Sequence, residues 1–199
     1  SVPPASWIEG VNRMDMTSFT SEYSKKSFDE VEFTKFDNNT QKAIGSLKVE
    51  KPSDVLFEGA DTNVYKQTKE ISNDLKKQFE TIKEDFCFLF VGHWLQGNLG
   101  EDRKDTGMLV KTFLETFKNV KDAPGLILKT SSSGFSIMDR NELKRKINQI
   151  KKSLNLDDFP NIYILHGDLS DEEMNQLYNH PKVKTHITFT HGEGFGRPL

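Results

Sequence analysis

Four short apolar segments divide the second half of the chain, and each has the length of a single strand. They are residues 86–91, 125–128, 161–165 and 184–189. The segments between them carry apolar residues three or four positions apart, as on one face of a helix. These segments are residues 108–117, 143–154 and 170–178. Strands and helices in alternation predict an α/β fold in which a parallel sheet, joined by right-handed crossovers, has helices on both faces.

Glycine-containing loops follow each of the four predicted strands. They are residues 92–107, 130–134, 166–169 and 191–198. In open parallel sheets, ligands bind in the crevice beyond the carboxyl ends of the strands. The pattern therefore predicts a ligand site at this edge of the sheet.

The first 80 residues follow no such alternation. We expect a short strand at residues 16–20, a helix that Ser21 caps and that runs to Phe28, and a strand at residues 55–57. Residues 34–50 are polar and are predicted to be irregular. We interpret residues 1–50 as the tail of a preceding domain with a connector, and residues 51–199 as the ligand-binding domain.

Composition narrows the function classes. The 199 residues contain 27 Lys and Arg against 30 Asp and Glu, a net charge of -3, whereas a sequence-blind nucleic-acid binder needs a basic excess. We therefore expect no nucleic-acid partner. Cys87 is the single cysteine, so no internal disulfide can form, and the apolar runs are too short for a transmembrane segment. A soluble, cytoplasmic protein is expected.

Two charged positions at the predicted edge could hold a ligand. Arg103 and Lys104 precede the first helix of the alternation, where cations and helix-terminal amides together can cradle a diphosphate. The alternative is a solvated basic pair. Glu193 lies between two glycines after the fourth strand and could accept hydrogen bonds from sugar hydroxyls; the alternative is a tight turn with an exposed acid.

Three histidines, His93, His166 and His191, fall at ends of predicted strands on this edge. No metal-binding motif accompanies them. We expect them to bond a ligand or cap a strand, and we expect no metal site. No P-loop, dinucleotide fingerprint or nucleophile elbow is present either.

The order of these motifs resembles family 4 glycosyltransferases, which are retaining, nucleotide-sugar-dependent enzymes with two Rossmann-like domains. The matching pieces are residues 90–92 (Phe-Val-Gly), Lys104, residues 162–167 (Ile-Tyr-Ile-Leu-His-Gly), residues 177–178 (Leu-Tyr) and residues 193–198 (Glu-Gly-Phe-Gly-Arg-Pro). The last string is the most specific. The resemblance covers residues 55–199 and implies that this part is the Rossmann-like donor domain.

The resemblance also implies roles for individual residues. Lys104 would hold the donor diphosphate and Glu193 the transferred sugar, and we regard both as catalytic. The family usually has arginine where this chain has His93, so either Arg103 supplies the second cation or the diphosphate is held more weakly. The resemblance implies two further kinds of donor contact. The backbone amides of Gly194, Phe195 and Gly196 would approach the sugar and the diphosphate. The backbone of Leu169 would contact the base.

The implied function is transfer of a sugar from a nucleoside-diphosphate-sugar donor to an unidentified acceptor (a saccharide, lipid or protein), with retention and without a metal or other cofactor. A non-catalytic nucleotide- or sugar-binding module and a sugar-nucleotide epimerase of the same architecture remain open alternatives. The resemblance further implies that the chain is a fragment of a longer protein, inactive alone, whose other domain could associate peripherally with a membrane.

Overall fold

A computed structural model of the chain describes residues 2–95, 99–132, 134–154, 158–193 and 196. The chain forms two compact units that divide between Ala60 and Asp61, later than the division predicted after residue 50. We describe each unit separately. Among the described residues, no helix combines the length and apolar character needed to cross a membrane.

The first unit is a small α/β arrangement. In chain order its elements are α1 (Ala5–Asn12), β1 (Thr17–Phe19), α2 (Glu22–Asp29), β2 (Phe33–Phe36), β3 (Ala43–Leu47) and β4 (Ser53–Val55). β1 and β4 pair in parallel, and β2 and β3 form an antiparallel pair. The predicted helix after Ser21 is confirmed, because the Ser21 side chain accepts a hydrogen bond from the Ser24 amide at its first turn.

The prediction that residues 34–50 are irregular is wrong, since β2 and β3 occupy much of this stretch. Most side chains of this hairpin are exposed, so no alternation of apolar and polar residues marks it. Its turn is built by Asp37, whose side chain accepts hydrogen bonds from the amides of Asn39 and Thr40. Sequence periodicity also missed α1.

The second unit contains the predicted parallel sheet. Its elements are α3 (Asn73–Glu80), β5 (Cys87–Val91), α4 (Thr106–Phe117), β6 (Gly125–Lys129), α5 (Ile137–Leu154), β7 (Ile162–Leu165), α6 (Asp171–Tyr178) and β8 (Val183–His186). The strand order is β7-β6-β5-β8, and all pairs are parallel. β8 ends at His186, earlier than predicted, and α3 was not predicted.

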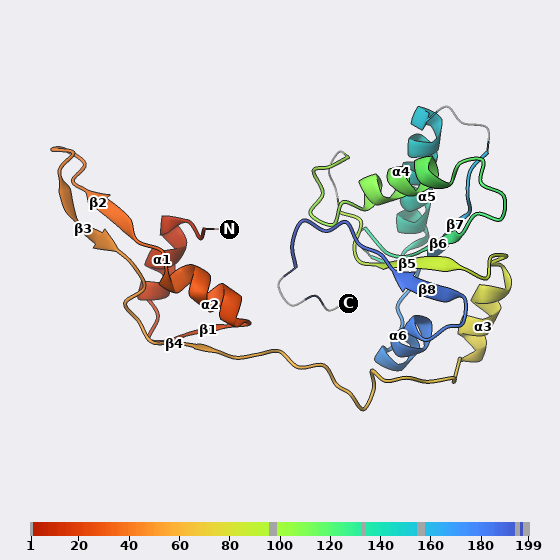
Figure 1. The fold of residues 1–199 in the computed structure, drawn as a ribbon, viewed down its shortest axis with the longest axis horizontal. Coiled ribbons are helices and arrows are strands. Elements are labelled where there is room, and N and C mark those ends of the chain that lie inside the picture. Colours follow the sequence, from red (N-terminus) through yellow and green to blue (C-terminus); the bar gives the residue numbers. More distant parts are fainter. Residues whose placement is uncertain (1, 96–98, 133, 155–157, 194–195, 197–199) are drawn as a thin grey trace. The chain divides into compact units, whose positions relative to one another are not determined.

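Helices cover both faces of this sheet (Figure 1). α4 and α5 pack on one face over a buried cluster that includes Phe90, Leu114 and Leu128. α3 and α6 pack on the other face over a cluster that includes Leu89 and Ile127. Successive strand residues point to opposite faces, which is why the strands read as continuous apolar runs. The predicted Rossmann-like α/β fold is confirmed for this unit.

The strand order reverses at one position, between β5 and β8. From β5 the chain winds outward through β6 to β7, and it then returns to place β8 on the other side of β5. The loops after β5 and β8 therefore lie next to each other at the carboxyl edge of the sheet. In doubly wound folds such a topological switch point is where ligands bind.

Candidate functional site

Two cations and one carboxylate meet at this switch point. The Lys104 ammonium donates a hydrogen bond to Glu193 Oε1. Arg103 Nη1 lies 3.5 Å from Glu193 Oε2 and donates to the Gly192 carbonyl at 2.7 Å. The loop between β5 and α4 supplies both cations, and the loop after β8 supplies the carboxylate. Residues 89 positions apart in sequence thus form one cluster.

The three side chains differ in their contact with solvent. The Lys104 side chain is 8% exposed, Glu193 is 20% exposed and Arg103 is 54% exposed. Burial acts to raise the pKa of Glu193, but the hydrogen bond and charge of Lys104, a hydrogen bond from Thr190 and the charge of Arg103 outweigh it. The net pKa lies below its ordinary value, so Glu193 is ionised at neutral pH.

Backbone and side-chain bonds fasten the two loops together. The His191 amide donates to the Arg103 carbonyl at 2.9 Å. His191 Nε2 lies 3.2 Å from Asp105 Oδ2, and the other Asp105 oxygen accepts from the Gly100 amide. Asp105 has left-handed backbone angles, φ 47° and ψ 38°, directly before α4, a conformation that aspartate tolerates better than most residues. These bonds set the position of the cations relative to Glu193.

Sequence reasoning assigned no role to Asp105, Thr190 or Asp102. The Thr190 hydroxyl lies 3.0 Å from the Gly192 carbonyl and 3.3 Å from the Arg103 carbonyl. Asp102 is buried, and its Oδ1 accepts from the Lys104 amide at 3.3 Å. Asp105 stands directly before α4, but its side chain makes no capping hydrogen bond, so the usual preference for aspartate at this position does not explain its bonds. The contacts of Thr190 and Asp102 depend on loop geometry that carries no motif.

The other predicted donor contacts are more scattered. His93 is exposed at the end of β5, where its Nδ1 lies 3.1 Å from Ser131 Oγ. Leu169 follows β7 and packs against the buried cluster under α3 and α6, and its amide donates a hydrogen bond to the side chain of its neighbour Asp168.

The last predicted donor contacts follow Glu193 in the chain. Gly196 has a left-handed backbone conformation with φ 87°. The predictions for Gly194 and Phe195 lie outside the described residues.

Gly92 packs closely against the Phe90 ring at the end of β5. A Cβ atom placed on Gly92 would lie 3.1 Å from the Phe90 ring and 3.8 Å from Lys104 Cδ. The first distance is too short for an undisturbed contact, so only glycine fits here without a shift of neighbouring atoms. The sequence pattern Val-Gly at this strand end therefore has a packing reason.

The predicted edge histidines lie within hydrogen-bonding distance of protein groups. His166 Nε2 lies 2.9 Å from Asp139 Oδ2, and Asp139 also accepts from the Ser132 amide and hydroxyl. Within residues 2–95, 99–132, 134–154, 158–193 and 196, no group of three or more His, Cys, Asp or Glu side chains is arranged to hold a metal ion.

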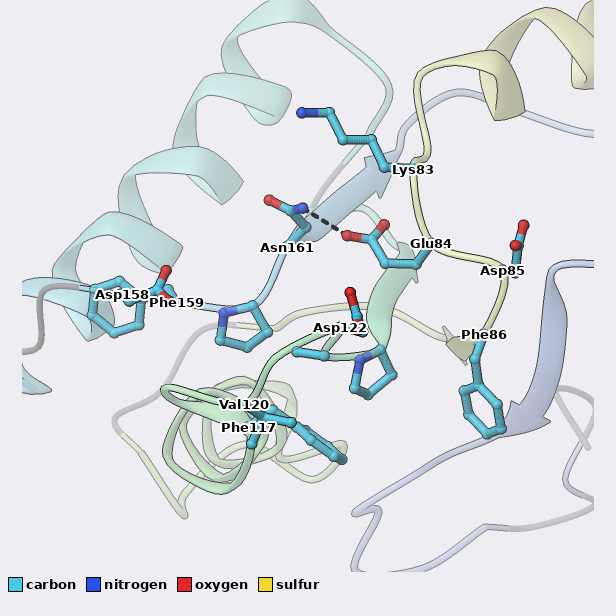
Figure 2. Close-up of a pocket in the computed structure, with 13 residues that line it drawn as sticks. Lys83, Glu84, Asp85, Phe86, Phe117, Val120, Asp122, Asp158, Phe159 and Asn161 are labelled. Atoms are coloured by element: carbon cyan, nitrogen blue, oxygen red, sulfur yellow. Dashed lines mark hydrogen bonds between the residues drawn. The ribbon is translucent and has the colours of Figure 1, made fainter.

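A polar pocket lies at the opposite, amino edge of the sheet. It has a volume of about 590 Å³, and its lining includes Glu84, Phe86 and Asn161. Figure 2 shows the Glu84 carboxylate directed at Asn161, which donates at 2.6 Å. Tyr163 donates to the other Glu84 oxygen at 2.8 Å. The hydrogen bonds of Glu84 therefore join neighbouring strand ends. By contrast, Arg103, Lys104 and Glu193, which we call the carboxyl-edge cluster, bring opposite charges together at the switch point.

Comparison with known proteins supports the assignment of the fold but does not assign the chain to a family. No family model matches the sequence, and no curated protein matches it significantly. The solved trehalose-6-phosphate synthase OtsA is similar in fold with a TM-score of 0.58 and 11% identity, over 95% of this chain and 42% of that chain. A trehalose-6-phosphate protein from E. coli, bound with UDP-2-fluoro glucose, gives a TM-score of 0.55 and 13% identity, over 95% of this chain and 43% of that chain.

A third structure is the C-terminal domain of a group 1 family glycosyl transferase, LpcC, from Francisella tularensis. It gives a TM-score of 0.46 and 18% identity, over 70% of this chain and 63% of that chain. The fold assignment rests on the two stronger matches, and the chain spans less than half the length of each. The chain therefore has a mixed α/β, Rossmann-like fold similar to that of these two structures.

Proposed function

We propose that the protein transfers a sugar from a nucleoside-diphosphate sugar to an acceptor, with retention of the anomeric configuration, and that the carboxyl-edge cluster binds the donor. The observation that carries the proposal is the convergence of Lys104, Arg103 and Glu193 at the topological switch point. The glycosyltransferase-like fold supports it, as does the solved relative in fold that is bound with UDP-2-fluoro glucose. The retention of configuration rests on the resemblance to family 4.

The cluster suits the chemistry of a diphosphate leaving group. When the bond between sugar and diphosphate breaks, negative charge grows on the diphosphate and positive charge grows on the sugar ring. Lys104 is held in place and largely shielded from water, so its charge stabilises the leaving group without reorganising at the moment of reaction. Arg103 is more exposed and can follow the outer phosphate as a second cation.

Glu193 has a different role in this proposal. Before the donor binds, its carboxylate pairs with Lys104 and Arg103, offsets one of their two charges and keeps them near the switch point. With the donor present, the diphosphate takes over part of that role, and Glu193 oxygens become free to accept hydrogen bonds from sugar hydroxyls. These steps use the chain's own cations, and we propose that no metal cofactor is needed.

The test uses the intact protein with a panel of nucleoside-diphosphate sugars and mixed saccharide, lipid and peptide acceptors. Product formation is followed by chromatography, and the anomeric configuration of the product by nuclear magnetic resonance. A product with the donor's configuration supports the proposal. An inverted product would refute retention, interconverted donor sugars would indicate an epimerase, and donor binding with no product would leave a binding module as the function.

A further inference from the structure

The sheet of the second unit has an open edge at β7. In the strand order β7-β6-β5-β8, β7 pairs with β6 alone among the strands of the described residues, and Figure 1 shows α5 beside it. A groove of about 570 Å³ runs along this edge between α3 and α5, with residues of β7 as its floor. Open strand edges are ready to pair with another chain unless something blocks them.

The backbone of β7 offers hydrogen-bonding groups to this groove. The Leu126 amide of β6 donates to the Asn161 carbonyl, and Leu126 is in register with Ile162. Alternate residues of a parallel strand bond to the same neighbour, so the N–H and C=O groups of Ile162 and Ile164 face away from β6. A further strand laid in the groove would meet donors and acceptors at both residues.

The wall of the groove formed by α5 is basic. Arg140, Lys144 and Lys151 line it, and their spacing of four and seven residues places them on one face of the helix. None of the groove's described lining residues is acidic, and no ion pair of the described residues involves these three cations. The Lys151 ammonium lies over the Phe159 ring at 5.3 Å, and burial alone lowers its pKa.

We propose that this groove binds an extended acidic segment of a partner protein, which adds a parallel or antiparallel strand to β7 and pairs its carboxylates with Arg140, Lys144 and Lys151. Charge complementarity selects this occupant, because three cations face the groove and no acid of the described residues does. Strand addition provides affinity through main-chain bonds, and side chains provide specificity. The site lies outside the carboxyl-edge cluster and does not depend on the proposed transferase activity.

The helix and an added strand match in spacing. Four residues of α5 separate Arg140 from Lys144, a rise of about 6 Å. Side chains on one face of a strand repeat every second residue, about 6.6 Å apart. Glutamates two positions apart on a bound strand would therefore lie opposite Arg140 and Lys144, whereas Lys151 lies a further rise of about 10.5 Å along α5 and would face a residue about three positions further on. A segment of about five residues spans the distance from Arg140 to Lys151.

Fluorescence anisotropy with a labelled, end-blocked Glu-Val-Glu-Val-Glu peptide tests the proposal on the whole chain. We expect saturable binding, and about tenfold or more weaker binding to the double variant Arg140→Glu/Lys144→Glu, because two attractions become two repulsions. The matched control is Lys118→Glu/Lys152→Glu, which changes the net charge equally at exposed residues outside the groove; it should bind as the unmodified chain does. Equal weakening by the control, or no binding of the peptide, would overturn the proposal.

Two further probes separate strand addition from simple charge attraction and leave the chain unaltered. The same peptide N-methylated at every residue keeps its charge but cannot form the ladder, and it should lose binding. A Lys-Val-Lys-Val-Lys peptide should not bind. Equal binding of either probe would overturn strand addition of an acidic segment, as would self-association of the chain that the double variant abolishes, since the occupant would then be a second copy.

Discussion

The carboxyl and amino edges of one sheet each hold a partly buried glutamate, and the two glutamates have different partners. At the amino edge, Glu84 accepts hydrogen bonds from the neutral groups of Asn161 and Tyr163. At the carboxyl edge, Glu193 meets the cations Lys104 and Arg103. Both carboxyl groups have a pKa below the ordinary value, although burial alone would raise it in each case.

The difference shows why a polar cluster is not by itself a binding site. Glu84 joins residues that precede β5 to the start of β7, and replacing its partners with a ligand would break bonds that hold strand ends together. The pairs at Glu193 join loops around the switch point, where a bound anion could replace the carboxylate. Position in the topology, together with exchangeable charge partners, distinguishes the functional candidate.

The largest expected difference between the edges is in catalysis. Lys104→Met should lower turnover by about a hundredfold to a thousandfold, because a positioned charge that stabilises the leaving group is lost. The matched variant Lys83→Met removes a lysine from the amino-edge pocket and should leave turnover unchanged. Steady-state kinetics of the intact protein measures both, with circular dichroism to confirm folding. Similar turnover in the two variants would break the distinction.

Removal of the amino-edge carboxylate should act on stability. Glu84→Ala loses two hydrogen bonds and is expected to lower the free energy of unfolding by about 1–2 kcal/mol, as measured by urea denaturation. The affinity for donor should not change. A weakened donor affinity at unchanged stability would show that the amino edge takes part in binding.

A smaller effect is expected when only one donor at the amino edge is removed. Burial and the bond to Glu84 raise the pKa of Tyr163 to about 12. Tyr163→Phe should therefore remove one late ionisation from a spectrophotometric titration and lower stability by about 1 kcal/mol. A Tyr163 that titrates at its ordinary pKa of 10 would contradict the hydrogen-bonded geometry of this edge.

The smallest effect is in the salt dependence of the two carboxyl groups. The pKa of each carboxyl group is lowered in the folded protein, so each ionised group stabilises the fold at a pH above 4.5, its ordinary pKa. That stabilisation is lost as the pH falls through the lowered pKa. Charges lower the pKa of Glu193, in part through exposed Arg103, whereas neutral hydrogen bonds dominate the lowering at Glu84. In nuclear magnetic resonance titrations, added salt should raise the pKa of Glu193 more than that of Glu84; the reverse order would contradict the assignment of causes.

The sequence predicted the sheet well because its strands are buried on both faces. The runs around Phe88 and Ile127 have few polar residues, and a helix pattern separates each run from the next. Helix α3 was not predicted because only Leu75 and Phe79 are buried in it and its other residues are polar. The hairpin β2–β3 escaped because its exposed residues show no periodicity.

The candidate site was predictable in its charged residues but not in its framework. Arg103, Lys104 and Glu193 follow strands in glycine-containing segments, so topology alone brings them to one edge. The bonds that set their geometry come from Asp105 and Thr190. These depend on loop conformation, including the left-handed backbone of Asp105, which local sequence does not determine.

Binding calorimetry tests the central claim, that the carboxyl edge is the donor site, most directly. The intact protein is titrated with a panel of nucleoside diphosphates and their sugars, alongside Arg103→Ala/Lys104→Ala, Glu193→Gln and the amino-edge control Lys83→Ala. We predict that at least one nucleotide sugar binds to the unmodified protein and the control, that the double variant loses binding, and that Glu193→Gln weakens binding of the nucleotide sugar more than of the free diphosphate. Binding that survives the double variant, or no binding by a folded protein across the panel, would contradict the claim.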